Sequence, residues 1–471
     1  MRGVTLVRSA MIVGAMLAAW PAGASGPTPM PPAAVRAEAR DIFQTLIAFQ
    51  TVAGRGQVPA MARYLAGKFQ AAGFPAEDIE ILPHGETASL IVRYRGTDRA
   101  AKPIVFLAHM DVVEANQSDW VRDPFELVEE NGYFFGRGTA DVKQEIALLT
   151  TTFLRLEAEG FVPARDLVLA FSGDEETEMD TASELAIRLS GAEFALNGDG
   201  GQGVLNGATG KPEVYYLQGA EKYYATFELT TRNPGGHSSQ PRADNAIYEL
   251  ADALEALKAY RFPVMWNDWT LGSFRESAKV TPGALGEAMA KFAADPQDAA
   301  AADALSANPQ QVGKLRTTCV ATMLKGGHAE NALPQSATAT VNCRVFPGVP
   351  VDEVKATLQR LAGDKVEVKP VGTLHPSGPS PMRPDVVAAV TQAVHAGYPG
   401  VPIVPEMAAY ATDGSIFRAA GIPTYGASSW FTKDSDVFSH GLNERISVAS
   451  FYAGLGHWYV LATTLGGAPG R

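Results

Sequence analysis

Apolar residues in the first half of the chain follow two patterns, which predict helices and buried strands. Residues 34–50 and 57–73 place apolar side chains at the three- and four-residue spacing of amphipathic helices. Residues 102–108 and 166–171 are short, almost continuous apolar runs, typical of strands buried on both faces of a sheet. The intervening residues 140–160 have a helical pattern that ends at a glycine. This alternation predicts an α/β domain with a mainly parallel sheet covered by helices.

The pattern changes after residue 219, where apolar and polar positions begin to alternate as in a half-exposed strand. The elements then follow the order strand–helix–strand–strand–helix–strand, which matches a ferredoxin-like unit. They are predicted at 223–231, 245–260, 317–325, 337–346, 351–361 and 365–371. Alanine-rich residues 285–310 predict a helical insertion, whereas the fold of 262–285 is not indicated. The Pro-rich segment 376–381 resembles a hinge, so we expect an inserted domain at 219–378 between two parts of the α/β domain, 25–218 and 379–471.

The N-terminus resembles a secretory signal, predicted as residues 1–24. Arg2 and Arg8 precede an apolar run over 10–20, and Ala22-x-Ala24 supplies a small-residue cleavage site before Ser25. The run is too short for a stable membrane-spanning helix, although a membrane anchor is the alternative. The sequence therefore predicts an exported protein, periplasmic or secreted.

Composition excludes several classes of protein without naming a function. Hydrophobic residues make up 46 % of the 471 residues, enough for a folded core rather than a disordered chain. The formal charge of −12 argues against nucleic acid as the main partner, because phosphate binding needs a basic face. Two cysteines exclude a disulfide-rich scaffold. In an oxidising compartment Cys319 and Cys343 can pair, and two separate buried thiols fit the sequence equally well.

Histidines and carboxylates gather where the predicted strands end, which is where open α/β sheets build their sites. His109 and Asp111 follow the strand at 102–108, so the histidine can bind a metal while the carboxylate holds its other ring nitrogen. The spacing His-x-Asp is weak evidence alone. Asp141 precedes a helix and can equally be its N-cap.

Three further segments add acids and a second histidine. Asp174, Glu175 and Glu176 repel one another unless a cation compensates, although a solvated acidic turn explains them as well. Asp199 lies in a glycine-rich turn, and His440 lies near the C-terminus. Nitrogen and oxygen ligands without thiolates suit zinc, or else cobalt or manganese. Two metal ions sharing one carboxylate account for the number of acids.

The ordered series of motifs resembles the co-catalytic zinc exopeptidases, which include aminoacylase, acetylornithine deacetylase, glutamate carboxypeptidase and carboxypeptidase S. The resemblance extends beyond the acids and covers nearly the whole chain after residue 24. Within the family, the sequence is most similar to the carboxypeptidase S branch. Its further motifs are Asp119-Trp120, Asp123-Pro124-Phe125, Gly235-Gly236-His237-Ser238-Ser239-x-Pro241, Gly326-Gly327-x-Ala329-x-Asn331-x-Leu333-Pro334, Arg344-x-Phe346-Pro347-Gly348 and Thr412-Asp413-Gly414.

This resemblance implies a role for each metal-site residue. Asp141 would bridge two zinc ions, with His109 and Asp199 completing one site and Glu176 and His440 the other. Asp111 would orient His109, and Glu175 would be the general base toward the bridging water. Family members often have Glu at the position of Asp199, and the local sequence Asn197-Gly198-Asp199 also departs from their pattern. The motif therefore supports this ligand less than the others.

The resemblance also implies how substrate binds. His237 on the inserted domain would reach the active site of a partner subunit, which makes the inserted domain a lid and a homodimer surface. Asn331, Arg344 and Gly414 would bind a peptide or N-acyl amino acid, with Arg344 on a free carboxylate beside the cleaved amide. His237 in a surface loop and Arg344 on a strand surface are the plainer alternatives.

The sequence therefore predicts an exported di-zinc amidohydrolase of carboxypeptidase, dipeptidase or aminoacylase type. An aminopeptidase of a related di-zinc fold and a non-catalytic exported binding protein are the rival hypotheses. The binding protein is disfavoured because every expected ligand position is filled and Glu175 is present.

Overall fold

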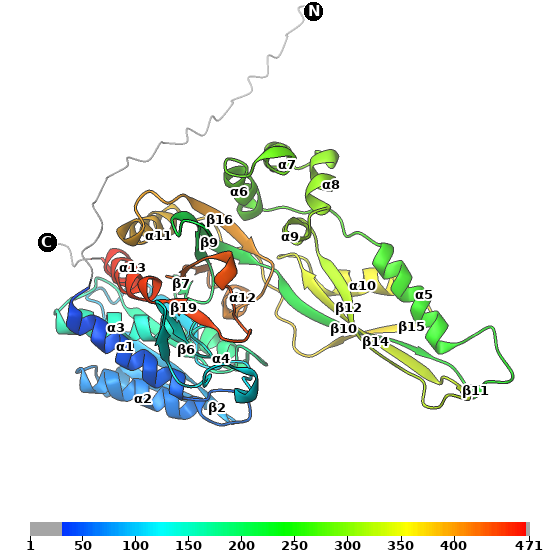
Figure 1. Cartoon of the computed structure of the whole chain (residues 1–471), viewed down its shortest axis with the longest axis horizontal. Coiled ribbons are helices and arrows are strands. Elements are labelled where there is room, and N and C mark those ends of the chain that lie inside the picture. Colours follow the sequence, from blue (N-terminus) through cyan, green and yellow to red (C-terminus); the bar gives the residue numbers. More distant parts are fainter. Residues whose placement is uncertain (1–30, 468–471) are drawn as a thin grey trace, which may run out of the picture.

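The computed structural model describes residues 31–467, and the predicted signal segment lies outside them. A ten-stranded sheet forms the centre of the larger domain (Figure 1). Its order is β1-β2-β6-β3-β7-β17-β9-β8-β18, and β16 also pairs with β9. The strands are β1 (Ile79–His84), β2 (Thr87–Tyr94), β3 (Ile104–His109), β6 (Leu167–Ser172), β7 (Phe194–Asn197), β8 (Gln202–Leu205), β9 (Pro212–Glu221), β16 (Ile403–Ala408), β17 (Thr424–Gly426) and β18 (Phe431–Thr432).

Helices cover both faces of this sheet, as the continuous apolar strands predict. On β3, Ile104 and Phe106 pack into the core on one face, whereas Val105 and Leu107 pack into the core on the other. Because successive side chains of a strand point to opposite faces, such a strand needs apolar residues at every position. One face carries α1 (Ala33–Ala48), α2 (Val58–Ala71), α3 (Lys143–Ala158), α11 (Pro384–Gly397) and α13 (Val448–Gly466), and the other carries α4 (Asp180–Arg188) and α12 (Asp413–Ala419).

The central strands β6, β3, β7 and β17 are parallel neighbours, which confirms the predicted α/β class with a mainly parallel sheet. Their carboxyl ends therefore meet at one edge of the sheet, where the candidate residues lie. Short elements complete the domain: β4 (Val128–Glu130), β5 (Tyr133–Phe135), β19 (Arg445–Ser447) and the 3-10 turns η1 (Ala76–Asp78), η2 (Gln117–Asp119) and η3 (Asp434–Asp436). Within residues 31–467, no helix is long and apolar enough to cross a membrane.

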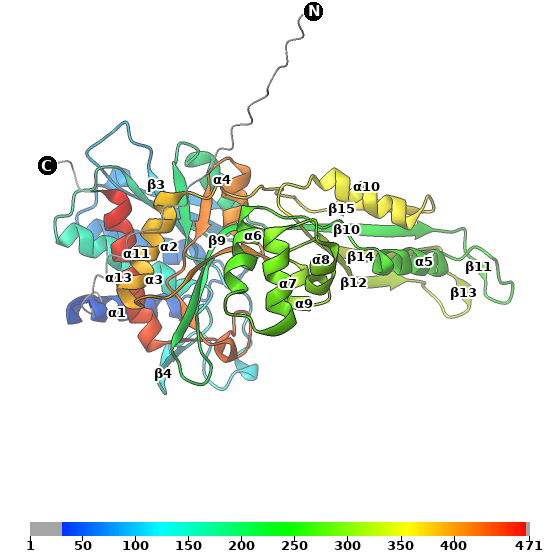
Figure 2. The ribbon, with the colours of Figure 1, turned by 90° about the horizontal axis from the view of Figure 1, so that it is seen from above.

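The inserted domain projects from this body as an arm (Figures 1 and 2). Its antiparallel sheet has the order β12-β14-β10-β15, and two helices cover one face, as in the predicted ferredoxin-like unit. A small two-stranded antiparallel sheet of β11 and β13 forms the outer end of the arm (Figures 1 and 2). The elements are β10 (Tyr223–Arg232), β11 (Gly236–His237), α5 (Ala246–Ala259), β12 (Thr318–Gly326), β13 (Ala332–Leu333), β14 (Ser336–Val345), α10 (Val351–Ala362) and β15 (Val366–Val371). We call this domain the lid.

The helical insertion is larger than the alanine-rich segment suggested. It consists of α6 (Asp268–Ser277), α7 (Gly283–Ala294), α8 (Ala299–Ser306) and α9 (Pro309–Val312). Helix α6 packs against β16 of the larger domain. The Trp269 indole donates to the Ser380 carbonyl at 2.7 Å and lies so close to Gly219 that any Cβ there would collide with it. The insertion thus contacts both chain segments that join the larger domain to the lid. The sequence of 262–285 did not indicate this role, because the residues that it contacts are distant in the chain.

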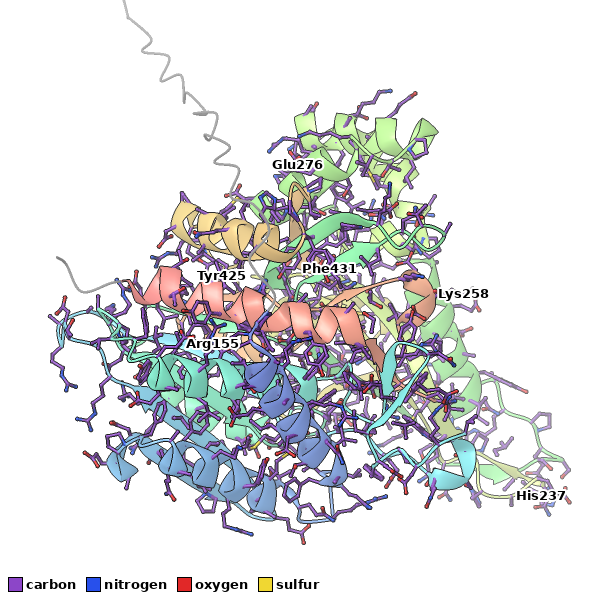
Figure 3. All side chains as sticks on the ribbon, turned by 60° about the vertical axis from the view of Figure 1, so that its left-hand side comes forward. Arg155, His237, Lys258, Glu276, Tyr425 and Phe431 are labelled. Carbon is purple, nitrogen blue, oxygen red and sulfur yellow. A yellow bond between two sulfur atoms is a disulfide. The ribbon has the colours of Figure 1, made fainter. Side chains whose placement is uncertain are left out.

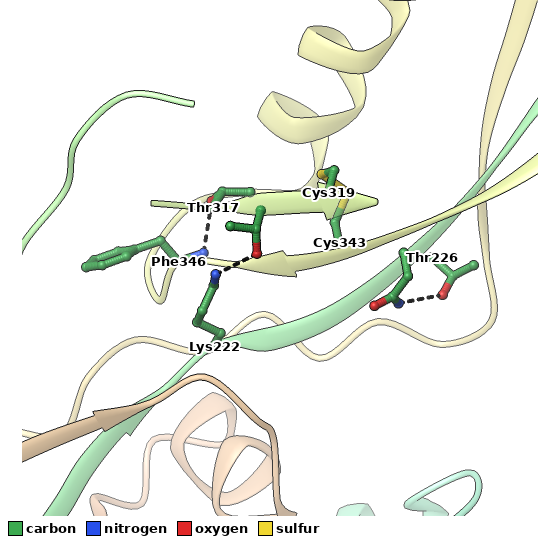
Figure 4. Close-up of a disulfide and its surroundings, with 8 residues drawn as sticks. Lys222, Thr226, Thr317, Cys319, Cys343 and Phe346 are labelled. Carbon is green, nitrogen blue, oxygen red and sulfur yellow. Dashed lines mark hydrogen bonds between the residues drawn. A yellow bond between two sulfur atoms is a disulfide. The ribbon is translucent and has the colours of Figure 1, made fainter. Parts of the chain in front are cut away.

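Cys319 and Cys343 are joined by a disulfide (Figure 4). They face each other in register on the antiparallel strands β12 and β14. Of the two alternatives that the sequence left open, the structure contains the paired one.

Buried His457 on α13 makes folding stability depend on pH. Burial lowers the pKa of His457 to about 4 from the ordinary 6.5, and Nε2 donates to the Ala427 carbonyl at 2.9 Å. Between these values the unfolded chain binds a proton that the folded chain refuses, so stability rises with pH from about 4 to 6.5. We expect His457→Gln, which keeps a donor, to remove about 2 kcal/mol of the stability lost between pH 7 and 5. Urea unfolding of both proteins at the two pH values measures this, and equal losses would contradict it.

Candidate active site

The end of β3 is tied to the end of β6 through Asp111. His109 Nδ1 lies 3.0 Å from the Asp111 carbonyl oxygen and 3.5 Å from its carboxylate. The carboxylate of Asp111 accepts the backbone N–H groups of Glu175 at 3.1 Å and Glu176 at 2.9 Å. The predicted orientation of His109 by Asp111 therefore comes mainly from its carbonyl, whereas its carboxylate fixes the loop that carries both glutamates.

Asp141 lies between the two candidate histidines. Its Oδ1 is 3.0 Å from His109 Nε2, and its Oδ2 is 3.2 Å from His440 Nε2. It does not cap α3, since residue 142 occupies the cap position and no side chain caps that helix end. One carboxylate with each oxygen on a different imidazole has the arrangement of a bridging ligand.

The three adjacent acids after β6 have separate roles. Asp174 accepts the N–H groups of Asp180 and Thr181 at the start of α4. Glu176 lies 3.0 Å from His440 Nε2, and Glu175 is only 9 % exposed. A solvated acidic turn is therefore wrong for this segment.

The candidate ligands form two overlapping groups. His109, Asp141 and Glu176 have ligand atoms within 4.8 Å of one another, as do His109, Glu175 and Asp199. Asp199 Oδ2 lies 3.9 Å from His109 Nε2, so the shorter Asp side chain still reaches the cluster. Imidazole nitrogens and carboxylate oxygens without thiolates are the donors of zinc and related divalent ions, so the residues fit a metal centre.

Electrostatics show how crowded this cluster is. Burial, together with neighbouring carboxylates, raises the pKa values of Glu175 and Asp199 well above the ordinary range. Hydrogen bonds to Asp141 and Glu176 raise the pKa of His440 to about 10, and hydrogen bonds from both histidines lower the pKa of Asp141 against the effect of burial. Four carboxyl groups around two imidazoles create a site that attracts cations.

A buried ion pair supports the loops of Asp141 and His440. Arg137 Nη1 lies 2.7 Å from a Glu444 oxygen, and the other Glu444 oxygen accepts the N–H groups of Ala140 and Asp141. Arg137 Nη2 also donates to the His440 carbonyl at 3.4 Å. Sequence reasoning gave these two residues no role, although opposite charges inside two ligand-bearing motifs were an available signal.

A cavity of about 710 Å³ opens over the cluster and is shared by body and lid. Its wall includes the candidate ligands Asp141, Glu176, Asp199 and His440, the base candidate Glu175, and Arg344 from the lid. The Arg344 guanidinium lies over the Tyr224 ring, with Cζ 4.9 Å from the ring centroid. Among residues 31–467, no carboxylate pairs with it, so a substrate anion can meet it in the cavity.

His237 and Asn331 do not line this cavity. They lie together at the outer end of the lid, where Ser238 N donates to the Asn331 carbonyl at 3.1 Å (His237 is labelled in Figure 3). His237 Nδ1 accepts from the Ser239 amide at 3.1 Å, and the imidazole is exposed. The structure thus separates Asn331 from Arg344, although the resemblance assigned both to substrate binding.

Gly414 lies behind the cavity wall. Its N–H donates to the Thr412 hydroxyl at 3.0 Å as part of the cap of α12, and the residue is buried. In this conformation its amide is not free to contact substrate. The neighbours Thr412 and Ser415 line the cavity instead.

The sequence pattern of peptidase family M20/M25/M40 matches residues 105–464, which contain all the candidate residues. The chain belongs to this family. As an M20 peptidase it is a metal-dependent hydrolase of peptide or N-acyl amide bonds, and the resemblance inferred from the motifs is confirmed.

Relatives and solved structures agree with this assignment. The N-fatty-acyl-amino acid synthase/hydrolase PM20D1 of Xenopus tropicalis is 30 % identical over 76 % of this M20 peptidase and 72 % of its own length. The M20 family metallo-carboxypeptidase Sso-CP2 from Sulfolobus solfataricus has the same fold, with a TM-score of 0.69 and 18 % identity over 90 % of this chain and 98 % of that one. The Bacillus subtilis YXEP protein, titled a dinuclear metal binding peptidase, has a TM-score of 0.56 and 13 % identity over 92 % and 100 % of the two chains.

Proposed function

We propose that this M20 peptidase is an exported di-zinc hydrolase that cleaves N-acyl amino acids beside their free carboxylate. The observation that carries the proposal is the shared cavity, whose lining includes both the Asp141–His440 cluster and Arg344, a cation with no carboxylate partner among residues 31–467. A cationic group and a cluster of metal-ligand candidates in one cavity fix a substrate with a carboxylate near its cleaved bond.

The donor set would hold two zinc ions: Asp141 would be shared, His109 and Asp199 would complete one site, and Glu176 and His440 the other. Cobalt and manganese accept the same donors. When bound, the metal ions polarise the amide carbonyl and acidify the attacking water.

The chain's own residues then move the proton. Glu175 takes the proton of the attacking water and delivers it to the leaving nitrogen, a role that suits a buried carboxyl whose pKa is raised. Asp111 holds Glu175 through its backbone N–H at 3.1 Å. Arg344 holds the substrate carboxylate, which aligns the amide with Glu175.

The acyl group that fits this cavity is apolar. Its wall includes Met179, Val371, Leu374, Trp430 and Val437. The similar Xenopus protein is named for N-fatty-acyl amino acids, which supports the same choice here. Burial of an acyl chain stabilises binding by about 0.8 kcal/mol for each CH₂ group.

The test is a panel of matched substrates with mass detection of products. Zinc-loaded enzyme meets N-octanoyl-alanine, N-acetyl-alanine, alanyl-alanine and N-octanoyl-alaninamide, which lacks the carboxylate. We expect kcat/KM to be highest for N-octanoyl-alanine and at least about tenfold lower for the amide. Cleavage of alanyl-alanine while both N-acyl acids stay intact would indicate the aminopeptidase alternative, and no cleavage would favour the binding protein.

We also propose that the lid forms a homodimer. The edge strand β12 and the adjacent α5 expose apolar side chains, among them Leu324 at 64 % and Tyr248 at 64 %. An open strand edge with apolar neighbours favours pairing with a second copy. In such a dimer His237 and Asn331 can reach the active site of the partner subunit, since neither lines the cavity of its own chain.

Export is supported by two independent features. The predicted signal occupies residues 1–24, and the disulfide between Cys319 and Cys343 persists in an oxidising compartment. Mass determination of the protein from culture or periplasm checks removal of the segment before Ser25.

A further inference from the structure

Lys222 is a buried cation at the junction of body and lid. It connects β9 to β10, has 0 % exposed surface, and its backbone N–H donates to the Ala408 carbonyl at 3.0 Å. Its Nζ donates to the Thr318 hydroxyl at 2.9 Å, as Figure 4 shows. An ammonium group can donate three hydrogen bonds, but among residues 31–467 Lys222 Nζ makes this one alone.

Two carboxylates on the adjoining strands β9 and β16 are engaged elsewhere. Glu221 precedes Lys222 in the chain, but its carboxylate pairs with Arg418. Glu406 on β16 pairs with Lys314 at 3.5 Å. Within the described part of the chain, Lys222 therefore has no ion-pair partner.

The charged neighbour of Lys222 is instead another cation, Arg344. Thr318, which binds Lys222, pairs in register with Arg344 across β12 and β14. Tyr224 pairs in register with Arg344 across β10 and β14, and the Arg344 guanidinium lies over its ring. Burial and the Arg344 charge lower the pKa of Lys222 to about 7.

We propose that Lys222 is a positioning residue for the substrate carboxylate, acting with Arg344 as the second cation of one anion site. This inference rests on the proposed function. Lys222 does not line the cavity, so it acts on the carboxylate through its field and through Arg344, whereas Arg344 makes the contact.

The physical reason is that a buried cation, Lys222, and a half-buried one, Arg344, gain most from a shared anion. Without one, each cation keeps its desolvation cost and they repel each other. A carboxylate against Arg344 converts this repulsion into attraction from both charges in a medium where charges interact strongly. The site therefore favours a carboxylate over a neutral amide of the same shape.

The same argument separates function from structure. A residue retained for packing should destabilise the fold when replaced, whereas removal of an unpaired buried charge leaves stability unchanged or raises it. We expect Lys222→Met, which keeps an apolar stem of similar length, to melt at or above the temperature of the native chain.

The experiment compares the hydrolysis of N-octanoyl-alanine and N-octanoyl-alaninamide by Lys222→Met and by the native enzyme. We expect Lys222→Met to raise KM about tenfold for the acid, with kcat within about twofold, and to leave the amide kinetics unchanged. Lys222→Gln, which can still bind Thr318, should match Lys222→Met. Thr318→Val keeps the charge without the hydrogen bond and should keep a KM near the native value.

Arg344→Met, run in parallel, separates the two hypotheses. If the native enzyme shows no preference for the acid, the proposed carboxylate recognition fails and the role of Lys222 fails with it. If Arg344→Met abolishes the preference while Lys222→Met leaves it intact, only the role of Lys222 is overturned. Equal losses on acid and amide, or a misfolded Lys222→Gln beside a folded Thr318→Val, would also overturn it, because they indicate a structural lysine.

Discussion

Replacement of Glu175 by Gln should lower kcat about a thousandfold, within the range that a positioned general base contributes. The amide is almost isosteric but cannot accept the water proton. Glu175 is buried, and its backbone is fixed by Asp111, so the substitution leaves the loop in place. The predicted ligands Asp141, Glu176 and His440 are unchanged, so metal content should stay near the native value.

Steady-state kinetics on N-octanoyl-alanine together with elemental analysis of bound metal measure both quantities. Asp174→Ala is the matched control, because the neighbouring acid caps α4 rather than facing the cluster. It should cost about 1 kcal/mol of stability and keep the turnover of the folded fraction. A Glu175→Gln enzyme that turns over normally would remove Glu175 as the base, and one that loses its metal would make it a ligand.

Replacement of His237 by Ala should lower kcat about a hundredfold, because a histidine that reaches the partner's active site would donate to the oxyanion formed there. The imidazole lies at the far end of the lid and outside its own cavity, so it can act only in a second subunit. In mixed dimers with Glu175→Gln, one of the two sites has both an intact base and an intact histidine. Random exchange of equal amounts should therefore restore about a quarter of native activity.

The measurement is activity after mixing, with light scattering to establish that dimers are present. His328→Ala is a control on the same stretch of the lid, between β12 and β13, and should keep native activity. An inactive mixture of dimeric proteins would show that the sites are not shared. A fully active His237→Ala would show that this histidine has no catalytic role.

The central strands and most of the cluster follow from local sequence. Alternate residues of β3 pack into opposite cores because the run from Ile104 to Ala108 is apolar without interruption. His109, Glu175 and Asp199 follow three strands that turn out to be parallel neighbours, so the rule for open sheets brings them together. His440 belonged to the same set of candidates, and the family resemblance assigned it to the second metal site.

Local sequence failed where a role depends on what a side chain meets across the fold. Asp174, Glu175 and Glu176 look alike in sequence. In the fold, Asp174 accepts an N–H at the start of α4, whereas Glu176 lies against His440. Gly414 matched a substrate-binding motif, yet its N–H is used by Thr412.

The sequence by itself determined the fold class, the donor atoms and the family, because apolar period, residue type and motif order are properties of short segments. Only the tertiary structure decided which charges are partnered. Glu444 accepts the Asp141 N–H and pairs with Arg137, whereas neither Lys222 nor Arg344 has a carboxylate partner among residues 31–467. The burial and pairing of a charge depend on segments that are distant in the chain. Burial and pairing in turn decide whether the charge stabilises the fold or is available to bind a substrate.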